Sequence, residues 1–210
     1  YDDAISIEKL EMGSFRLWVH IADVSHYVRI NSLLDQEAFQ RGTSVYFPDR
    51  AIPMLPETLS NDLCSLKPKV DRLTITVVLE IDSQGVVQNK KFFRSVICSD
   101  ERMTYTQVNK IVTGKDKKNR DCHESLVQVF LWMSELCEVL VDQRRKRGSI
   151  DLDLPEPQIE YDADGDVLDI VRSERNQAHR IIEEFMILAN ETVADYIESS
   201  GAKCTYRVHE

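Results

Sequence analysis

The sequence predicts a fold of the α+β class, in which a mixed and largely antiparallel sheet packs against long helices. In the first half of the chain, apolar residues alternate with polar ones at a period of two, which is typical of half-buried strands. In the second half they recur at spacings of three and four residues, which is typical of helices with one apolar face. Strand and helix patterns do not alternate regularly along the chain, so a parallel α/β sheet is not expected.

The strands are predicted from the alternating stretches. A strand-like segment follows the first residues of the chain, and residues 15–22 carry apolar side chains at every second position. Residues 73–81 show the same alternation, and the Asp-Ser-Gln-Gly sequence at 82–85 turns the chain into a further strand at 86–97. These last two strands are therefore expected to form a hairpin.

The part of the chain between these strands has a different character. Residues 33–40 are expected to form a short helix, whereas residues 46–66 form a long irregular stretch that contains Pro48, Pro53 and Pro56. Long ordered loops are more often functional than ornamental. We therefore expect the irregular stretch to contribute to function.

Two long helices are predicted in the second half. The first covers residues 126–141, whose apolar positions fall on one stripe, and it ends in a basic run at 142–147 followed by Gly148. Basic residues suit the negative end of the helix dipole, and glycine suits a left-handed cap. A hairpin turn is expected around residues 163–165, and a second long helix at 177–199.

Length and composition describe one globular domain, or part of one. The chain has 210 residues, of which 42% are hydrophobic and 30% charged, enough to bury a sizeable core. No apolar run approaches the roughly 20 residues of a membrane helix. Five cysteines, widely spaced and never in a C-x-x-C pair, disfavour a disulfide framework and a zinc site and favour reduced thiols in a cytoplasmic protein.

The net charge of −10 at first disfavours a polyanionic partner, because Lys and Arg dominate affinity for nucleic acids. Its distribution weakens that objection. Eight acidic residues and no basic one lie between residues 150 and 170, so most of the excess negative charge belongs to that one segment. Basic clusters stand elsewhere, at 115–120 and 144–147.

Asp2 and Asp3 are the first candidates for chemistry. They are adjacent carboxylates ahead of a predicted strand. Carboxylate oxygens are ligands that Mg²⁺ or Mn²⁺ prefers when further acids converge on the ion. A solvated turn is the alternative for the pair, since Asp is common in turns and caps.

Other candidate motifs are weaker. Asp23 and His26 could hold a metal or act as a base, but a strand end that satisfies its own backbone groups is the better interpretation. The acids at 162, 164 and 166 resemble a calcium loop only in part, because Gly165 stands at the fourth position and Ser173 at the twelfth. No phosphate-binding glycine motif and no catalytic triad is present.

Aromatic and acidic side chains offer a second set of candidates. Four rings stand in predicted loops or at the starts of elements, where a ring can stack on a base: Tyr27, Tyr46, Phe47 and Tyr105. For any one of them alone, core packing is the better explanation. Glu183 and Glu184 lie beside the apolar stripe of the second long helix, so at least one is expected to flank the core and face a cleft, with a solvated helix face as the alternative.

Eight motifs follow one another along the whole chain. They are Asp-Asp-Ala at 2–4, Ile-Ala-Asp-Val-Ser-His-Tyr-Val at 21–28, Arg-Gly-Thr-Ser-Val-Tyr-Phe-Pro-Asp-Arg at 41–50, Ile-Pro-Met-Leu-Pro-Glu at 52–57, Leu-Ser-Asn-Asp-Leu-Cys-Ser-Leu at 59–66, Arg-Gly at 147–148, His-Arg-Ile-Ile-Glu-Glu-Phe-Met-Ile-Leu-Ala-Asn at 179–190 and Tyr-Arg-Val-His-Glu at 206–210. In this order they resemble the catalytic RNB domain of the ribonuclease II and ribonuclease R exoribonuclease family. The Tyr-Phe-Pro-Asp-Arg and Tyr-Arg-Val-His-Glu spellings look like the ribonuclease R branch.

The resemblance implies processive hydrolysis of RNA from its 3′ end, with release of nucleoside 5′-monophosphates. It also implies Mg²⁺, or alternatively Mn²⁺, held by four aspartates. Asp2 and Asp3 match the last two of the four, as catalytic residues and metal ligands, and the other two are expected upstream of Tyr1. Convergent carboxylates suffice for two-metal phosphodiester hydrolysis, which needs no protein nucleophile and so explains the missing triad.

The resemblance further implies RNA-binding roles for four positions. Tyr46 matches a ring that stacks on the RNA, and Tyr105 matches the aromatic residue that clamps the terminal nucleotide. Glu183 matches an acid near the 3′ nucleotide that acts with this tyrosine in telling RNA from DNA. A second stacking position, aromatic in many relatives, falls on Leu152, which offers no ring.

The implied partners are single-stranded RNA or structured RNA with a 3′ tail, together with the RNA-degradation machinery, and the protein is expected to be a monomer away from membranes. Family members carry OB domains on both sides of the catalytic domain. Residues 1–210 are therefore expected to be part of one RNB domain and to be inactive or nearly so alone.

Two other functions compete with this interpretation. One is a non-catalytic RNA-binding or scaffold relative of the same fold. The two upstream aspartates distinguish the alternatives, because a protein that lacks them could not assemble the four-carboxylate cluster. The other is an unrelated metal phosphoesterase, which the lack of any histidine ligand motif disfavours.

Overall fold

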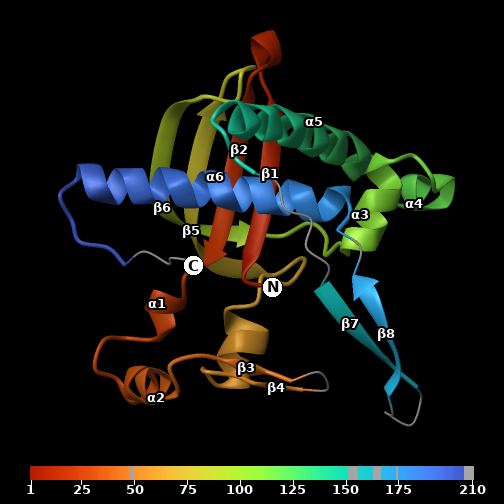
Figure 1. Cartoon of the computed structure of the whole chain (residues 1–210). Coiled ribbons are helices and arrows are strands. Elements are labelled where there is room, and N and C mark those ends of the chain that lie inside the picture. The colour runs from red at the N-terminus through yellow and green to blue at the C-terminus, as the bar shows by residue number, and fades with distance from the viewer. Residues whose placement is uncertain (48–49, 151–155, 163–166, 174, 206–210) are drawn as a thin grey trace.

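The computed structural model describes residues 1–47, 50–150, 156–162, 167–173 and 175–205 (Figure 1). Along the chain the elements are β1 (Asp3–Lys9), the 3-10 turn η1 (Glu11–Gly13), β2 (Phe15–Ala22), α1 (Val24–Tyr27), α2 (Leu33–Arg41), β3 (Val45–Tyr46), β4 (Ala51–Ile52), the π-helical turn η2 (Thr58–Leu63), β5 (Asp71–Ile81), β6 (Val87–Cys98), α3 (Tyr105–Val112), α4 (Lys117–Cys122), α5 (Glu124–Lys146), β7 (Glu156–Tyr161), β8 (Val167–Ser173) and α6 (Gln177–Ser199). The predicted α+β class is confirmed.

A four-stranded antiparallel sheet in the order β1-β2-β5-β6 forms the centre of the molecule. Figure 1 shows α5 and α6 lying across one face of it. Leu17 of β2 pairs with Ile7 on one side and Leu79 on the other, and paired residues share a face. This face packs against the helices, and the fully buried Leu136 and Phe185 contribute the helical half of the core.

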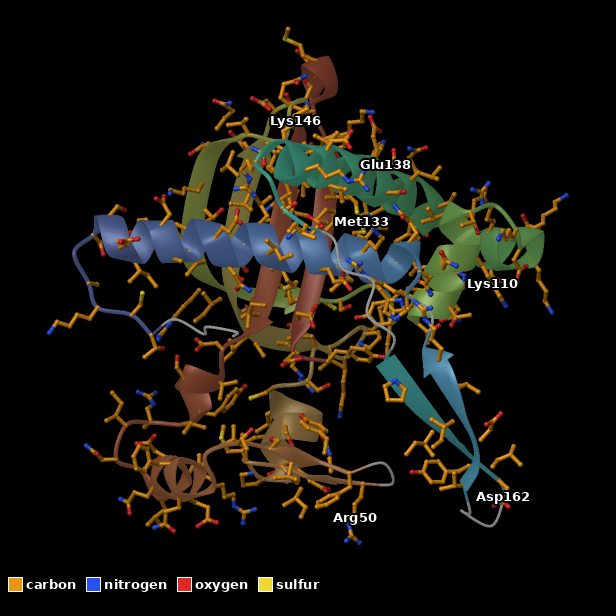
Figure 2. All side chains as sticks on the ribbon, in the orientation of Figure 1. Arg50, Lys110, Met133, Glu138, Lys146 and Asp162 are labelled. Carbon is orange, nitrogen blue, oxygen red and sulfur yellow. The ribbon has the colours of Figure 1, made fainter. Side chains whose placement is uncertain are left out.

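The long helices expose one side and bury the other, as the apolar stripes predict. In α5, Met133 is buried and Glu138 is exposed (Figure 2). The helix ends as expected: Gly148 takes a positive φ of 93°, and its N–H donates to the carbonyl of Arg145 at 2.9 Å. No helix within the described ranges is long and apolar enough to cross a membrane.

Two smaller parts lie outside the sheet-and-helix layer. Residues 23–66, here called the lower lobe, hold α1, α2, β3, β4 and η2 below the sheet (Figure 1). A separate small core joins this lobe to the end of β2 through Ala22, Leu59, Cys64 and Leu66. The hairpin β7–β8 extends away from the sheet with Asp162 near its far end (Figure 2), and its predicted turn at 163–165 lies outside the described residues.

The structure departs from the sequence pattern in two places. The alternation in β2 predicts a buried Ile21, but this side chain is 42% exposed while His20 and Ala22 are buried. Ala22 is buried because it packs against the lower lobe, on the face of the sheet opposite to Ile21. The irregular stretch at 46–66 also contains a short β3–β4 ladder and the turn η2.

His20 provides a test of the fold through pH. Its ring is buried, its Nδ1 lies 2.8 Å from Thr76 Oγ1, and burial lowers its pKa. The folded state therefore binds fewer protons than the unfolded state at acid pH. Stability should be complete above the unfolded pKa of about 6.5 and should fall as the pH drops below it, by at most about 1.4 kcal/mol per pH unit.

Urea unfolding at pH 7.5 and 5.5 measures this effect. The His20→Gln variant should lose less free energy of unfolding between the two pH values than the wild type. His26→Gln, which changes an exposed histidine, is the control and should follow the wild type. The same pH dependence in His20→Gln and the wild type would contradict the prediction.

Candidate active site

A cavity of about 720 Å³ opens beside the free edge of the sheet, at the lower end of β1. Strand β1, the start of α3, the N-terminal halves of α5 and α6 and the segment 97–104 all contribute to its wall. Its apolar side includes Phe130, Met133 and Ile181, while Asp3 and Tyr105 supply polar groups. A cavity with an apolar wall and a few convergent polar groups is the usual form of a binding site.

The paired aspartates stand at the start of β1. The carbonyl oxygen of Asp2 accepts a hydrogen bond of 2.9 Å from the N–H of Ala22, and Asp3 pairs with Ile21, so the pair is held by the sheet. Asp2 is exposed and Asp3 is partly buried. Burial, and secondarily the charge of Asp2, raise the pKa of Asp3. Asp3 is therefore a strand residue with a crowded carboxylate, and not part of a solvated turn.

The donor chemistry of these two residues fits a hard cation, because both offer carboxylate oxygens and a cation would relieve their mutual repulsion. Two carboxylates are only part of a ligand set. Within the part of the chain that the structure describes, no group of three or more His, Cys, Asp or Glu side chains stands close enough to hold a metal. The described residues thus do not form a complete set of metal ligands by themselves.

Tyr105 lies at the first turn of α3, where Thr104 and Gln107 form a capping box. Its ring stacks on that of His179, with centroids 4.0 Å apart and an interplanar angle of 25°. Burial raises the pKa of Tyr105, and the negative charges of Asp3 and Glu183 act in the same direction. The tyrosine hydroxyl therefore belongs to the same electrostatic environment as the two acids.

Glu183 and Glu184 point in different directions from α6 and meet different partners. Glu183 is partly exposed and forms an ion pair with Arg175, whose Nη2 lies 2.5 Å from Oε2. Glu184 is buried and faces Arg144 of α5, with 3.1 Å between Oε2 and Nε. Glu184 therefore flanks the core, as expected, but it faces Arg144, and neither glutamate is among the residues that line the cavity beside β1.

The other sequence candidates lie elsewhere. Tyr46 is 80% exposed on β3 of the lower lobe and is not part of the cavity wall, and Leu152 lies outside the described residues. Asp23 is buried as the N-cap of α1, where it accepts hydrogen bonds from Ser25 Oγ and the N–H of His26. The structural interpretation of that segment is confirmed.

Three residues of the site escaped the sequence analysis. Tyr1 and Arg102 line the cavity, and the Arg102 guanidinium stands 4.4 Å from the centroid of the Tyr1 ring. Arg102 is the only Lys or Arg among the described residues of the cavity wall. The third residue is His179. The sequence offered a signal for it, because Asn176 and His179 stand three residues apart, which is the spacing of a capping box at the start of a helix.

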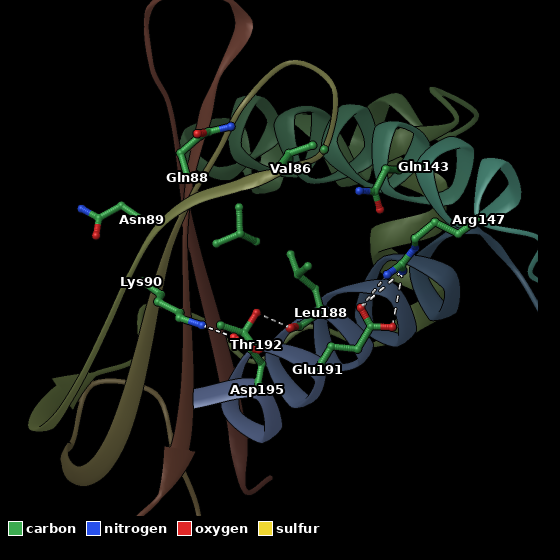
Figure 3. A pocket seen from close by; sticks show the side chains of 12 residues that line it. Val86, Gln88, Asn89, Lys90, Gln143, Arg147, Leu188, Glu191, Thr192 and Asp195 are labelled. Carbon is green, nitrogen blue, oxygen red and sulfur yellow. Dashed lines mark hydrogen bonds and ion pairs between the residues drawn. The ribbon is translucent and has the colours of Figure 1, made fainter. Parts of the chain in front are cut away.

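A second cavity, of about 420 Å³, lies between β6 and the helices α5 and α6 (Figure 3). Its charged side chains pair with one another across the opening, Lys90 with Asp195 and Arg147 with Glu191. These pairs neutralise the groups that could bind a ligand or act in catalysis. The cavity beside β1 is therefore the better candidate.

Comparisons with known proteins identify relatives over the full chain. The RNB domain family matches residues 1–210. Ribonuclease R from Thermotoga maritima is 49% identical over 100% of this chain and 29% of its own length, and ribonuclease R from Escherichia coli is 43% identical over 100% and 26%. The chain thus spans roughly a quarter to a third of the length of these relatives.

Solved structures agree with this assignment. Mycoplasma genitalium RNase R in complex with ribose methylated single-stranded RNA is 38% identical with a TM-score of 0.92, over 100% of this chain and 32% of that one. The same protein in complex with double-stranded RNA gives the same identity and TM-score, over 99% and 36%. Yeast Ssd1, described as a pseudonuclease, shares the fold at a TM-score of 0.72 and 19% identity over 95% and 24%. The chain belongs to the RNB domain family, with relatives named ribonuclease R.

Proposed function

We propose that the full-length protein is a 3′-to-5′ exoribonuclease that degrades RNA processively by hydrolysis and releases nucleoside 5′-monophosphates. The observation that supports this most directly is that Asp3 of β1 and Tyr105 of α3 line one cavity, while Glu183 of α6 lies one helical turn from His179, whose ring stacks on Tyr105. These are the residue types that cutting a phosphodiester, stacking on a base and contacting a ribose require. The named relatives and the RNA complexes of M. genitalium RNase R support RNA as the substrate.

Asp2 and Asp3 would hold Mg²⁺ or Mn²⁺ together with ligands from outside the described residues. When bound, such ions activate water and neutralise charge on the leaving 3′ oxygen. Burial favours the protonated form of Asp3. The two crowded carboxylates would therefore bind a cation in place of a proton only when the other metal ligands are also present. This explains why the two aspartates alone are insufficient and why residues 1–210 are expected to be inactive or nearly so by themselves.

Tyr105 and Glu183 would bind the 3′-terminal nucleotide. The tyrosine ring offers a flat surface that tolerates any base, as a degrader without sequence preference needs. The Glu183 carboxylate can accept a hydrogen bond from a ribose 2′-hydroxyl, which DNA lacks. Arg102 provides a positive charge for a phosphate in a wall that otherwise carries acids. Single-stranded RNA, or structured RNA with a 3′ tail, suits this arrangement. The protein would act as a monomer in the cytoplasm, together with the RNA-degradation machinery.

The full-length protein, incubated with Mg²⁺ and an RNA that carries a 3′ single-stranded tail, tests the proposal. Nucleoside 5′-monophosphates should appear from the 3′ end, and removing the metal with a chelator should stop their release. RNA binding without hydrolysis would contradict the proposal and would favour the scaffold alternative. The 210-residue chain serves as a comparison and should release few or no mononucleotides.

Tyr105 provides a further prediction. Tyr105→Ala in the full-length protein should raise KM for a short single-stranded RNA by roughly 5- to 150-fold, because a stacked base contributes about 1 to 3 kcal/mol. Tyr105→Phe keeps the ring and should retain most of this affinity. Initial rates over a range of RNA concentrations measure both effects. An equal rise in KM for the two variants would show that the ring is not the binding element.

A further inference from the structure

We propose that His179 is a positioning residue whose ring packs against one face of the Tyr105 ring. By holding Tyr105 in place, it increases the preference of the enzyme for a ribose over a deoxyribose at the 3′ end of the substrate. This inference rests on the proposed function and adds a residue to which neither the sequence motifs nor the comparisons assign a role. It concerns contacts within the chain, and His179 itself need not touch the RNA.

The stack between the two rings is close and nearly parallel. Their centroids are 4.0 Å apart and their planes differ by 25°, which places the imidazole against one face of the phenol ring. Tyr105 stays 46% exposed. One face of the tyrosine is thus covered by the protein, and a base can stack only on the exposed remainder.

His179 is itself fixed in place by the start of α6. The Asn176 side chain accepts hydrogen bonds from the N–H groups of Ala178 at 3.0 Å and His179 at 3.3 Å. The Nδ1 atom of His179 accepts in return from the N–H of Asn176 at 3.3 Å. Because Nδ1 accepts, the proton of the neutral ring resides on Nε2. His179 is therefore held through both its backbone N–H and its ring.

The same helix also carries Glu183, the acid proposed to act with Tyr105. Glu183 follows His179 by one helical turn, so both project from one side of α6. The Glu183 charge contributes to the raised pKa of Tyr105, in agreement with this placement. Arg175, just ahead of α6, holds the Glu183 carboxylate through its Nε and Nη2 atoms at 3.0 and 2.5 Å. The imidazole thus sets the plane of the tyrosine ring relative to Glu183.

Helix capping alone is the competing explanation for His179. A cap requires a hydrogen-bond acceptor at this position, but it does not require a flat ring stacked on a residue of another helix. The two explanations therefore differ in what they demand of the side chain. The stack demands planarity, and the cap demands the Nδ1 acceptor.

A matched pair of variants in the full-length protein separates these demands. His179→Phe and His179→Leu both remove the acceptor, and only phenylalanine keeps a flat ring. The readouts are KM and kcat for an RNA and for the same RNA ending in a 2′-deoxynucleotide. His179→Leu should reduce the ratio of kcat/KM between the two substrates by roughly three- to tenfold, the range expected for one aromatic pair, and His179→Phe should restore most of it.

Asn176→Ala is the control for the cap. It removes the acceptor for two N–H groups and leaves the imidazole against Tyr105, so it should lower the thermal midpoint without changing the substrate ratio. Equal ratios for the Phe and Leu variants would overturn the role of the ring. An inactive wild-type protein would instead overturn the proposed function itself.

Discussion

Replacing Asp2 by asparagine in the full-length protein is expected to lower the turnover of RNA by roughly a thousandfold, while RNA binding stays nearly unchanged. Asparagine keeps the size of the side chain but loses the negative charge that a divalent cation needs. A bound ion contributes several kcal/mol to the transition state, and a loss of about 4 kcal/mol corresponds to roughly a thousandfold in rate. Single-turnover rates and equilibrium RNA binding, both with Mg²⁺ present, measure the two effects separately.

Asp100→Asn is the matched control for this prediction. Asp100 also lines the cavity, and it is exposed and paired with Lys69 at 3.1 Å. The same chemical change there should leave turnover within a small factor of the wild type. If Asp2→Asn weakens RNA binding as much as it slows turnover, then Asp2 has a structural role and the proposed catalytic role is wrong.

Replacing Glu184 by alanine is expected to cost about 3 to 5 kcal/mol of stability. The side chain of Glu184 is 3% exposed, and its Oε2 lies 3.1 Å from Arg144 Nε, which joins α6 to α5 in the core. These two buried atoms make no hydrogen bond of good geometry within the described structure, so the contact between them is an ion pair. Removing the acid leaves the Arg144 guanidinium, which is largely shielded from water, without its negatively charged partner. Urea unfolding of the chain measures the loss.

Two comparisons show whether burial is the cause. Glu191→Ala removes a partner of Arg147 in a pair that is about half exposed, and it should cost no more than about 1 kcal/mol. The double change Arg144→Met with Glu184→Leu replaces the buried pair by apolar groups and should recover most of the stability lost in Glu184→Ala. Equal losses for Glu184→Ala and Glu191→Ala would contradict the prediction.

The long elements of the fold follow from sequence patterns, because each buries one continuous face. The strands at 15–22, 73–81 and 86–97 and the helices at 126–141 and 177–199 are all found within a few residues of their predicted bounds. The short helices α3 and α4 were missed, since neither is long enough to show a full apolar stripe. The capping box at Thr104 and Gln107 was the available signal for α3.

For the candidate site, the sequence likewise predicted the individual residues but not their arrangement in space. The motifs single out Asp3, Tyr105 and Glu183 as separate positions, each with a role that resemblance implies. Their common environment depends on the packing of α3 and α6 beside the edge of the sheet, which no local pattern specifies. The stack of Tyr105 on His179 depends on the same packing, since the two residues begin different helices.

The sequence by itself determined the α+β class, the long elements and the family, because periodicity and contiguous motifs are local properties of the chain. Only the tertiary structure decided which acid of the Glu183–Glu184 pair meets Arg175 at the surface and which one faces Arg144 in the core. It also decided that Ile21 is exposed while Ala22 is buried by the lower lobe. The physical reason is that burial depends on what covers each face, and the covering elements come from distant parts of the chain.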